Sequence, residues 1–206
     1  MRTGEPARRA GPSARPLGPG AVLSPLSDAE LAERARGLKW LLLDVDGVLT
    51  DGRLIYGPDG EQQKVFHVRD GLGLRLLQRS GLQIGILSGR ESKALKVRSD
   101  DLGIDFLMMN RSDKGPAFAE FLAERAVSPK EVAFMGDDLV DLPILLRCGL
   151  AFAPSDAVAE VRERAHRVLE SKGGWGVVRE LCELLLRARG DWKELTAPYY
   201  VVGEPD

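Results

Sequence analysis

The sequence predicts an α/β protein built on a Rossmann-like, doubly wound parallel sheet, with a β-hairpin flap and no separate cap domain. Short apolar runs alternate with helix-like segments, which is typical of a parallel sheet with helices on both faces. The first run, LLL at residues 41–43, is apolar without alternation, as expected for a strand buried on both faces. Acidic residues follow this run directly, and ligands of such sheets collect at the carboxyl ends of the strands. The pattern therefore places a polar crevice at one edge of the sheet.

The individual elements are predicted from capping signals, turn residues and apolar runs. Ser27 is expected to cap a helix over residues 28–37, because Glu30 three residues later completes a capping box. Residues 53–68 form two β-like arms around a PDG turn, which predicts a hairpin. Strands are expected at residues 39–45, 82–88, near Phe106, 132–135 and 150–152. Further helices are expected at residues 72–80, 91–101, from Lys114, after residue 135, at 156–164 and at 177–189.

Composition and charge narrow the classes of protein. The chain has 206 residues, of which 44% are hydrophobic, enough for one domain with a substantial core. We assign that domain to residues 27–190, between a disordered tail at 1–26 and a second tail at 191–206. The formal net charge of −2 argues against a nucleic-acid partner. No apolar run approaches the roughly 18 residues of a membrane span, so no membrane partner is expected.

The two cysteines and residues 1–26 indicate the cellular compartment. Cys148 and Cys182 lie in apolar surroundings, so no disulfide framework is expected and a reducing, cytoplasmic setting fits best. Residues 1–26 are rich in Gly, Pro, Ala and Arg and lack apolar periodicity, which indicates disorder. An organelle transit peptide is the minor alternative for this segment.

Several polar residues are predicted just beyond the strand ends, where they can carry chemistry. Two carboxylates at positions i and i+2, here Asp44 and Asp46, can divide the work of phosphoryl transfer between attack on phosphorus and movement of a proton. Such transfer needs the charge on the phosphate oxygens neutralised, commonly by Mg²⁺ and a lysine. Mg²⁺ prefers hard oxygen ligands. The remaining candidates are Asp137, Asp138 and Asp141 for oxygen ligands, Lys114 for the positive charge, and Ser88 as a phosphate contact.

The segments DVDGVLTDG and GDDLVD, with SGR and a lysine between them, resemble the four motifs of haloacid-dehalogenase-type phosphatases. The resemblance implies that Asp44 is the nucleophile that forms an aspartyl-phosphate and that Asp46 is the general acid and base. It implies that Mg²⁺ is held by Asp44, the backbone oxygen of Asp46, and Asp137. The other implied roles are contact with the phosphoryl group for Ser88 and Lys114, and support for Asp138 and Asp141.

A larger part of the chain is similar to the 3-deoxy-D-manno-octulosonate 8-phosphate phosphatases, through FHVRDGLGLR, SGRESKALKVR, SDKG, GDDLVDLPIL and KGGWGVVRELCELLL. The family implies Mg²⁺-dependent hydrolysis of a phosphorylated eight-carbon sugar acid, a step toward the lipopolysaccharide of Gram-negative bacteria. It also implies a homotetramer in which neighbouring subunits cover each crevice. Trp175 departs from the family, which often has an arginine there. The implied substrate contacts are Asp46, His67, Val68, Arg69, Asp70, Gly71, Arg75, Ser88, Gly89, Arg90, Arg98 and Lys114.

Alternatives stay open for the function and for single residues. The substrate could instead be a nine-carbon ulosonate 9-phosphate, and a non-catalytic oligomerisation module of the same fold is the rival from another class. From spacing alone, Arg75 and Arg98 fit solvated helix positions, Asp70 fits an N-cap, and His166 fits a surface helix. The apolar residues expected at interfaces or exposed are Tyr56, Val65 and Phe66 of the hairpin and Tyr199, Tyr200, Val201 and Val202 near the C-terminus.

Overall fold

The computed structural model describes residues 24–58 and 60–201. The predicted tail at residues 1–26 lies, up to residue 23, outside the described residues, as does Val202. No helix within the described residues combines the length and the apolar character needed to cross a membrane.

A six-stranded parallel sheet forms the centre of the protein, in the order β5-β4-β1-β6-β7-β8. The first strand, β1, lies between β4 and β6, so the chain adds strands on one side of β1 before it returns to the other. This reversal of strand order is the position at which such sheets open a crevice. The strands are β1 (Trp40–Leu43), β4 (Gln83–Leu87), β5 (Phe106–Met108), β6 (Val132–Met135), β7 (Leu150–Ala153) and β8 (Arg167–Val168).

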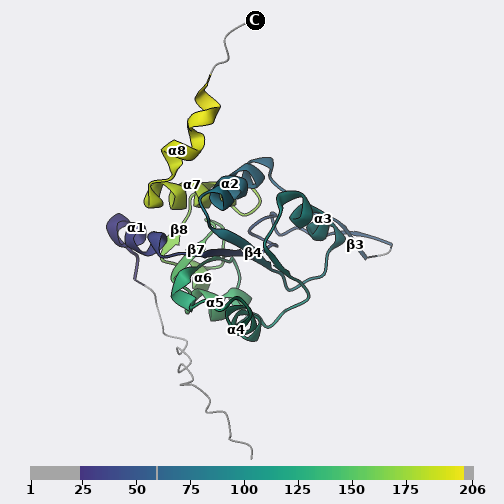
Figure 1. Ribbon diagram of the computed structural model, residues 1–206. Helices are drawn as coiled ribbons and strands as arrows, with labels where there is room; N and C mark the ends of the chain where they lie inside the picture. The colour runs from purple at the N-terminus through teal and green to yellow at the C-terminus, as the bar shows by residue number, and fades with distance from the viewer. Residues whose placement is uncertain (1–23, 59, 202–206) are drawn as a thin grey trace, which may run out of the picture.

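Helices cover both faces of this sheet (Figure 1). Alternate residues of β1 point to opposite faces: Leu41 and Leu43 enter one apolar cluster, and Trp40 and Leu42 enter the other. The doubly wound prediction is confirmed. The first cluster is packed by α1 (Asp28–Arg36), α2 (Val68–Arg79), α3 (Lys93–Leu102) and α7 (Val177–Arg189). The second is packed by α4 (Lys114–Arg125), α5 (Leu142–Leu145) and α6 (Ala159–Arg162).

The predicted hairpin is present between β1 and α2. It consists of β2 (Ile55–Gly57) and β3 (Gly60–Gln63), which pair antiparallel and project from one side of the body (Figure 1). It is the only sheet structure outside the central sheet in the described part of the chain. The segment is therefore a flap, as the sequence predicts. Below, "the flap" means residues 53–66, the hairpin with its two flanking arms.

Of the two helix caps that the sequence suggested, one is confirmed and one is wrong. Ser27 caps α1 through a capping box with Glu30. The second helix begins at Val68, four residues earlier than predicted, and its N-cap is His67. The N-cap role predicted for Asp70 is therefore wrong, because its buried carboxylate faces α7 and accepts a hydrogen bond from the backbone N–H of Arg179 at 2.7 Å.

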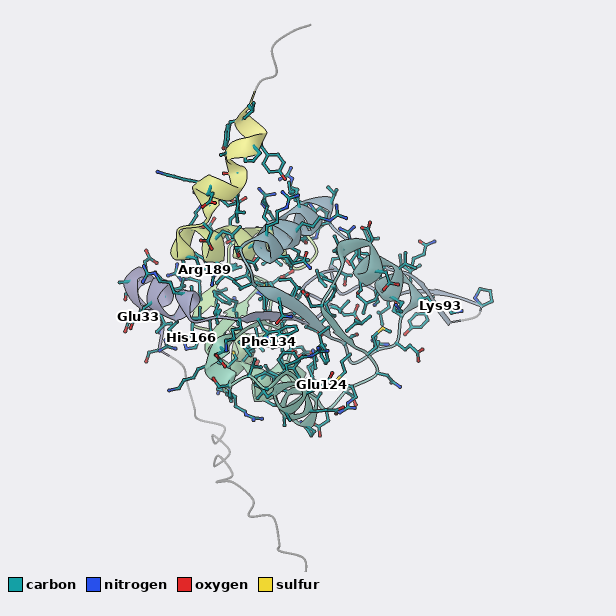
Figure 2. The ribbon with its side chains drawn as sticks, viewed as in Figure 1. Glu33, Lys93, Glu124, Phe134, His166 and Arg189 are labelled. Carbon is teal, nitrogen blue, oxygen red and sulfur yellow. The ribbon has the colours of Figure 1, made fainter. Side chains whose placement is uncertain are left out.

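His166 does not lie on a surface helix, as the sequence suggested. The helix predicted over 156–164 is the short α6, after which the chain turns into β8, a strand that the sequence analysis missed. His166 is 6% exposed, beside α1 in Figure 2, and its Nδ1 accepts a hydrogen bond from the backbone N–H of Ala151 at 2.9 Å. Burial, with the nearby Arg34 guanidinium, lowers the pKa of His166 to about 4. This histidine is a neutral part of the core edge.

The second predicted tail is largely helical. It forms α8 (Trp192–Thr196) and the 3₁₀ helix Ala197–Tyr200, which extend away from the body in Figure 1. The guanidinium of Arg187 lies over the Trp192 ring, 4.6 Å from its centroid, and so attaches α8 to α7. Tyr199, Tyr200 and Val201 are exposed, as expected.

Candidate active site

The ends of three adjacent strands bring the predicted polar residues together. Asp44 directly follows β1, Ser88 directly follows β4, and Asp137 comes two residues after the end of β6. Because β1 lies between the other two strands and all three are parallel, these residues lie at the same edge of the sheet. Lys114, the first residue of α4, points into this edge from the second layer of helices.

Lys114 is buried between two carboxylates. Its Nζ donates to Asp44 Oδ1 at 2.6 Å and to Asp141 Oδ1 at 2.5 Å, and the lysine is 2% exposed. Burial acts to lower the pKa of Lys114, but the two carboxylates outweigh it, so the pKa lies above its usual range. The ammonium is therefore a fixed positive charge beside Asp44.

Asp141 and Asp138 organise the loop that carries Asp137. Asp141 is fully buried, and its Oδ2 accepts hydrogen bonds from the backbone N–H groups of Asp137 at 2.9 Å and Asp138 at 3.2 Å. Asp138 caps the following 3₁₀ helix, Leu139–Asp141, through the N–H of Leu139. Both oxygens of Asp141 are thus occupied by donors of the protein, which fits the predicted supporting role.

The carboxylates of Asp44, Asp137 and Asp141 form a group that suits a divalent cation. One oxygen from each lies within 4.8 Å of the others, and the buried Oδ1 of Asp137 has no hydrogen-bond partner among the described residues. Burial raises the pKa of Asp44 to about 6 and that of Asp137 to about 8, and repulsion between the carboxylates adds to both. A hard cation such as Mg²⁺ would relieve that repulsion, so the donor set fits the predicted metal.

Two glycines allow the backbone and carboxylates to approach each other this closely. Gly47 has φ +95°, and a Cβ on it would fall 2.0 Å from Asp137 Oδ2. A Cβ on Gly173 would fall 1.9 Å from the backbone oxygen of Gly47, and Gly174 donates its N–H to the oxygen of Val48 at 2.9 Å. The Gly-Gly turn therefore clamps the loop that carries the first two aspartates.

Asp46 is held by residues that sequence reasoning did not find. Its Oδ1 accepts a hydrogen bond from Lys64 Nζ at 2.6 Å, and Thr50 Oγ1 lies 3.5 Å from the same oxygen. Arg90, which was predicted at the site, has its Nε 3.9 Å from Asp46 Oδ2. Lys64 could not be found by spacing, because it reaches Asp46 only where the second arm of the flap returns to the sheet edge.

The remaining predicted contacts lie in three different places. Ser88 is buried, and its Oγ accepts the backbone N–H of Arg90 at 3.2 Å, so the serine shapes the SGR turn. Arg75 and Arg98 lie where α2 meets α3. Arg75 donates a hydrogen bond to the backbone oxygen of Asp101, and Arg98 donates one to its carboxylate, each at 2.9 Å. The structure thus does not bring these two arginines to the carboxylates. The segment of His67, Val68, Arg69, Asp70 and Gly71 forms the N-cap and first turn of α2.

The fold and the clustered carboxylates define a haloacid dehalogenase-like hydrolase, and a family model with that description matches residues 87–181. The chain is 42% identical over 165 residues to the 3-deoxy-D-manno-octulosonate 8-phosphate phosphatase KdsC of Yersinia pestis, which covers 80% of this chain and 88% of that protein. It therefore belongs to the family of 3-deoxy-D-manno-octulosonate 8-phosphate phosphatases.

Two further relatives agree with this placement. KdsC of Escherichia coli K12 is 42% identical over 166 residues, which cover 81% of this chain and 88% of that protein. The crystal structure of the Moraxella catarrhalis phosphatase, in complex with magnesium ion, phosphate ion and a KDO molecule, superposes with a TM-score of 0.80 at 33% identity. The match covers 82% of this chain and 98% of that one.

Proposed function

We propose that the protein hydrolyses 3-deoxy-D-manno-octulosonate 8-phosphate to the free sugar acid and phosphate, through an aspartyl-phosphate on Asp44. The observation that carries the proposal is the buried contact between Asp44 and Lys114, with Asp137 alongside, in a chain of this family. This arrangement supplies a carboxylate nucleophile, a fixed cation and oxygen ligands at the end of one strand.

The first step is attack of an Asp44 carboxylate oxygen on phosphorus. A bond forms between that oxygen and phosphorus while the bond from phosphorus to the sugar oxygen breaks, and Asp46 donates a proton to the departing sugar oxygen. In the second step Asp46 takes a proton from water, the water oxygen attacks phosphorus, and Asp44 is released as a carboxylate. Lys114 remains beside Asp44 throughout and offsets the negative charge on the phosphoryl oxygens.

Asp44, Asp137 and the backbone oxygen of Asp46 are the groups that would hold Mg²⁺. Support comes from the unpartnered Oδ1 of Asp137 and from the magnesium ion in the Moraxella catarrhalis relative. When bound, Mg²⁺ neutralises charge on the phosphate and orients it for in-line attack. Asp141 stays with Lys114 and the loop N–H groups, since both of its oxygens already accept hydrogen bonds.

For the substrate we propose contacts with Arg90 beside Asp46, with Ser88 and Gly89 of the same turn, and with the first turn of α2. Arg90 is half exposed at the crevice and can reach an anionic sugar acid. Arg75 and Arg98 would have to leave Asp101 to take part. Trp175, which is 65% exposed, offers an aromatic surface where family members often have a guanidinium.

We also propose a cytoplasmic homotetramer in which the flaps lie at subunit interfaces. Ile55, Tyr56 and Val65 leave apolar side chains exposed on the flap, which favours burial against another surface. Phe66, which was also expected at an interface, packs instead against the main core, with the Arg98 guanidinium 6.0 Å from its ring centroid. Both cysteines are free and buried, as a reducing compartment would allow.

A panel of sugar phosphates tests this function. Purified protein with Mg²⁺ should release phosphate from the octulosonate 8-phosphate with the highest kcat/KM, well above that for a nine-carbon ulosonate 9-phosphate or for p-nitrophenyl phosphate. Preference for the nine-carbon ester would move the assignment to that substrate. If no phosphate is released from any ester, even with Mg²⁺ present, the result would favour the non-catalytic module.

A further inference from the structure

The general acid and base Asp46 is held from two sides by cations from two different segments. Lys64, at the end of the flap's second arm, donates to Asp46 Oδ1 at 2.6 Å, and its side chain is 1% exposed. Arg90, in the turn after β4, lies on the other side, 3.9 Å from Oδ2. Taking an ammonium out of water is costly, and the contact with the Asp46 carboxylate helps to offset that cost for Lys64.

The flap has a second attachment at the same place. Arg90 Nη1 donates to the hydroxyl of Tyr56 on β2, at 3.3 Å. The two arms of the flap therefore both lead to Asp46, one through Lys64 directly and the other through Arg90. A displacement of the flap would break these contacts and change the environment of one catalytic carboxylate.

We propose that Lys64 is a positioning residue for Asp46. Its ion pair with Asp46 links the position of the flap to the orientation of the general acid. The ammonium fixes Oδ1, which leaves Oδ2 directed at the crevice for exchange of the proton with the sugar oxygen. The flap is then part of the catalytic machinery as well as a cover. This inference rests on the proposed function in assigning proton transfer to Asp46.

Two esters with different leaving groups separate positioning of Asp46 from a general structural role. A sugar alkoxide must be protonated as it leaves, whereas p-nitrophenolate leaves without a proton. Lys64→Met, which keeps the length of the side chain and removes the charge, should lower the single-turnover rate of the first step, phosphoryl transfer from the octulosonate phosphate to Asp44, by about tenfold to a hundredfold. It should change the same first-step rate for p-nitrophenyl phosphate by less than about threefold, because that step does not need the general acid, whereas the later hydrolysis of the aspartyl-phosphate uses Asp46 for both esters.

The matched control is Lys96→Met, the same change at an exposed lysine that pairs with Asp100 on α3. It should leave both esters at wild-type rates. Lys64→Arg keeps the charge and should recover most of the loss. In the double variant with Asp46→Asn, Lys64→Met should add little, because Lys64 acts through Asp46. Equal losses of the first-step rate on the two esters, or additive losses in the double variant, would overturn the proposal.

A readout independent of turnover addresses the flap itself. Hydrogen exchange of the amides in Ile55–Gly57 and Gly60–Gln63 should be faster in Lys64→Met than in Lys96→Met, since one anchor of the flap is gone. Unchanged exchange would contradict the anchoring role. If the wild type fails on the octulosonate phosphate, the proposed substrate is wrong. Hydrogen exchange, and the same comparison on another alkyl phosphate that the wild type cleaves, then decide the role of Lys64.

Discussion

The ammonium of Lys114 lies 2.6 Å from the Oδ1 atom of Asp44, although 70 residues separate them in the sequence. The contact joins the end of β1 to the start of α4 and is almost completely buried. It is therefore a structural link between two layers and places a positive charge beside the proposed nucleophile.

Lys114→Met should cost both stability and activity. Removal of the ammonium leaves Asp44 and Asp141 buried without their partner, a change that typically costs about 3–5 kcal/mol. The free energy of unfolding, measured by urea denaturation without added metal, should fall by that order. Lys39→Met is the control, because the pair between Lys39 and Glu131 lies at the surface, where solvent screens it, and its loss should change the free energy of unfolding much less. Similar losses in both variants would argue against a special role for the buried pair.

Asp44→Asn should retain the fold and lose nearly all turnover. An amide keeps the size of the side chain and can still accept from Lys114, but it cannot act as the nucleophile. Phosphate release should fall by at least about three orders of magnitude, with unchanged circular dichroism. Asp100→Asn, at an exposed position on α3, should behave as wild type. Turnover of Asp44→Asn within a few-fold of wild type would remove Asp44 from the mechanism.

Asp137→Ala should raise the Mg²⁺ concentration needed for half-maximal activity by tenfold or more, because it removes one of few anionic oxygen donors. Complete chelation should abolish wild-type activity, and added Mg²⁺ should restore it. Asp100→Ala is the control, since that side chain is exposed on α3 and lies outside the oxygen group. A metal titration of Asp137→Ala that overlays the wild-type curve would contradict the ligand role.

His166 should make the protein less stable in acid. Its pKa is lowered to about 4 in the folded state, mainly by burial, against 6.5 for a histidine in water. The unfolded chain therefore binds the proton more readily, and stability present above pH 6.5 is lost as the pH falls toward 4. His166→Asn retains an acceptor for the N–H of Ala151 and cannot titrate.

The test for His166 is the difference in unfolding free energy between wild type and variant across this pH range. Asp70, whose burial raises its pKa to about 6, contributes with the opposite sign but equally in both proteins. The wild type should lose on the order of 2 kcal/mol relative to His166→Asn between pH 7 and pH 4. A constant difference would show that His166 titrates normally.

Removal of the residues after Thr196 should affect the large substrate more than a small one. Tyr199, Tyr200 and Val201 are exposed apolar side chains at the end of a helical extension. If they cover a neighbouring subunit's crevice, their loss should change kcat and KM for the octulosonate phosphate while p-nitrophenyl phosphate is little affected. Light scattering gives the oligomeric state in parallel. Equal effects on both esters would exclude this role, and a fully active monomer would exclude the tetramer.

The sequence predicted most where one local signal was enough. The strand β6 and the helix α7 have the predicted bounds, because an apolar run and an uninterrupted amphipathic segment define them. The crevice was predictable because Asp44, Ser88 and Asp137 each follow a strand. Because the strands are parallel, residues that follow them lie together at one edge of the sheet.

The residues that were missed depend on contacts between distant segments. Asp70 is of a residue type that is common at N-caps and lies near a helix start. Its carboxylate instead accepts a hydrogen bond from the N–H of Arg179 in α7, because the N-cap of α7, Gly176, has no side chain to do so. Lys64 reads as a polar residue of a hairpin arm, and only the seated flap brings it to Asp46. His166 becomes buried because β8 adds to the sheet edge. No local pattern in the sequence encodes these three contacts.

The clamp of the Gly173–Gly174 turn on the loop after β1 has a consequence for folding. Residues 47 and 48, in the loop that carries Asp44 and Asp46, contact residues 173 and 174, far along the chain. The loop between them can close only after the intervening strands have assembled, so we expect a competent crevice to appear late in folding, as one of its longest-range contacts. A growing or truncated chain that stops before this turn would then hold both aspartates without a usable site. Such an incomplete chain would not hydrolyse phosphate esters in the cell. Adding residues 165–206 as a separate fragment should then restore activity.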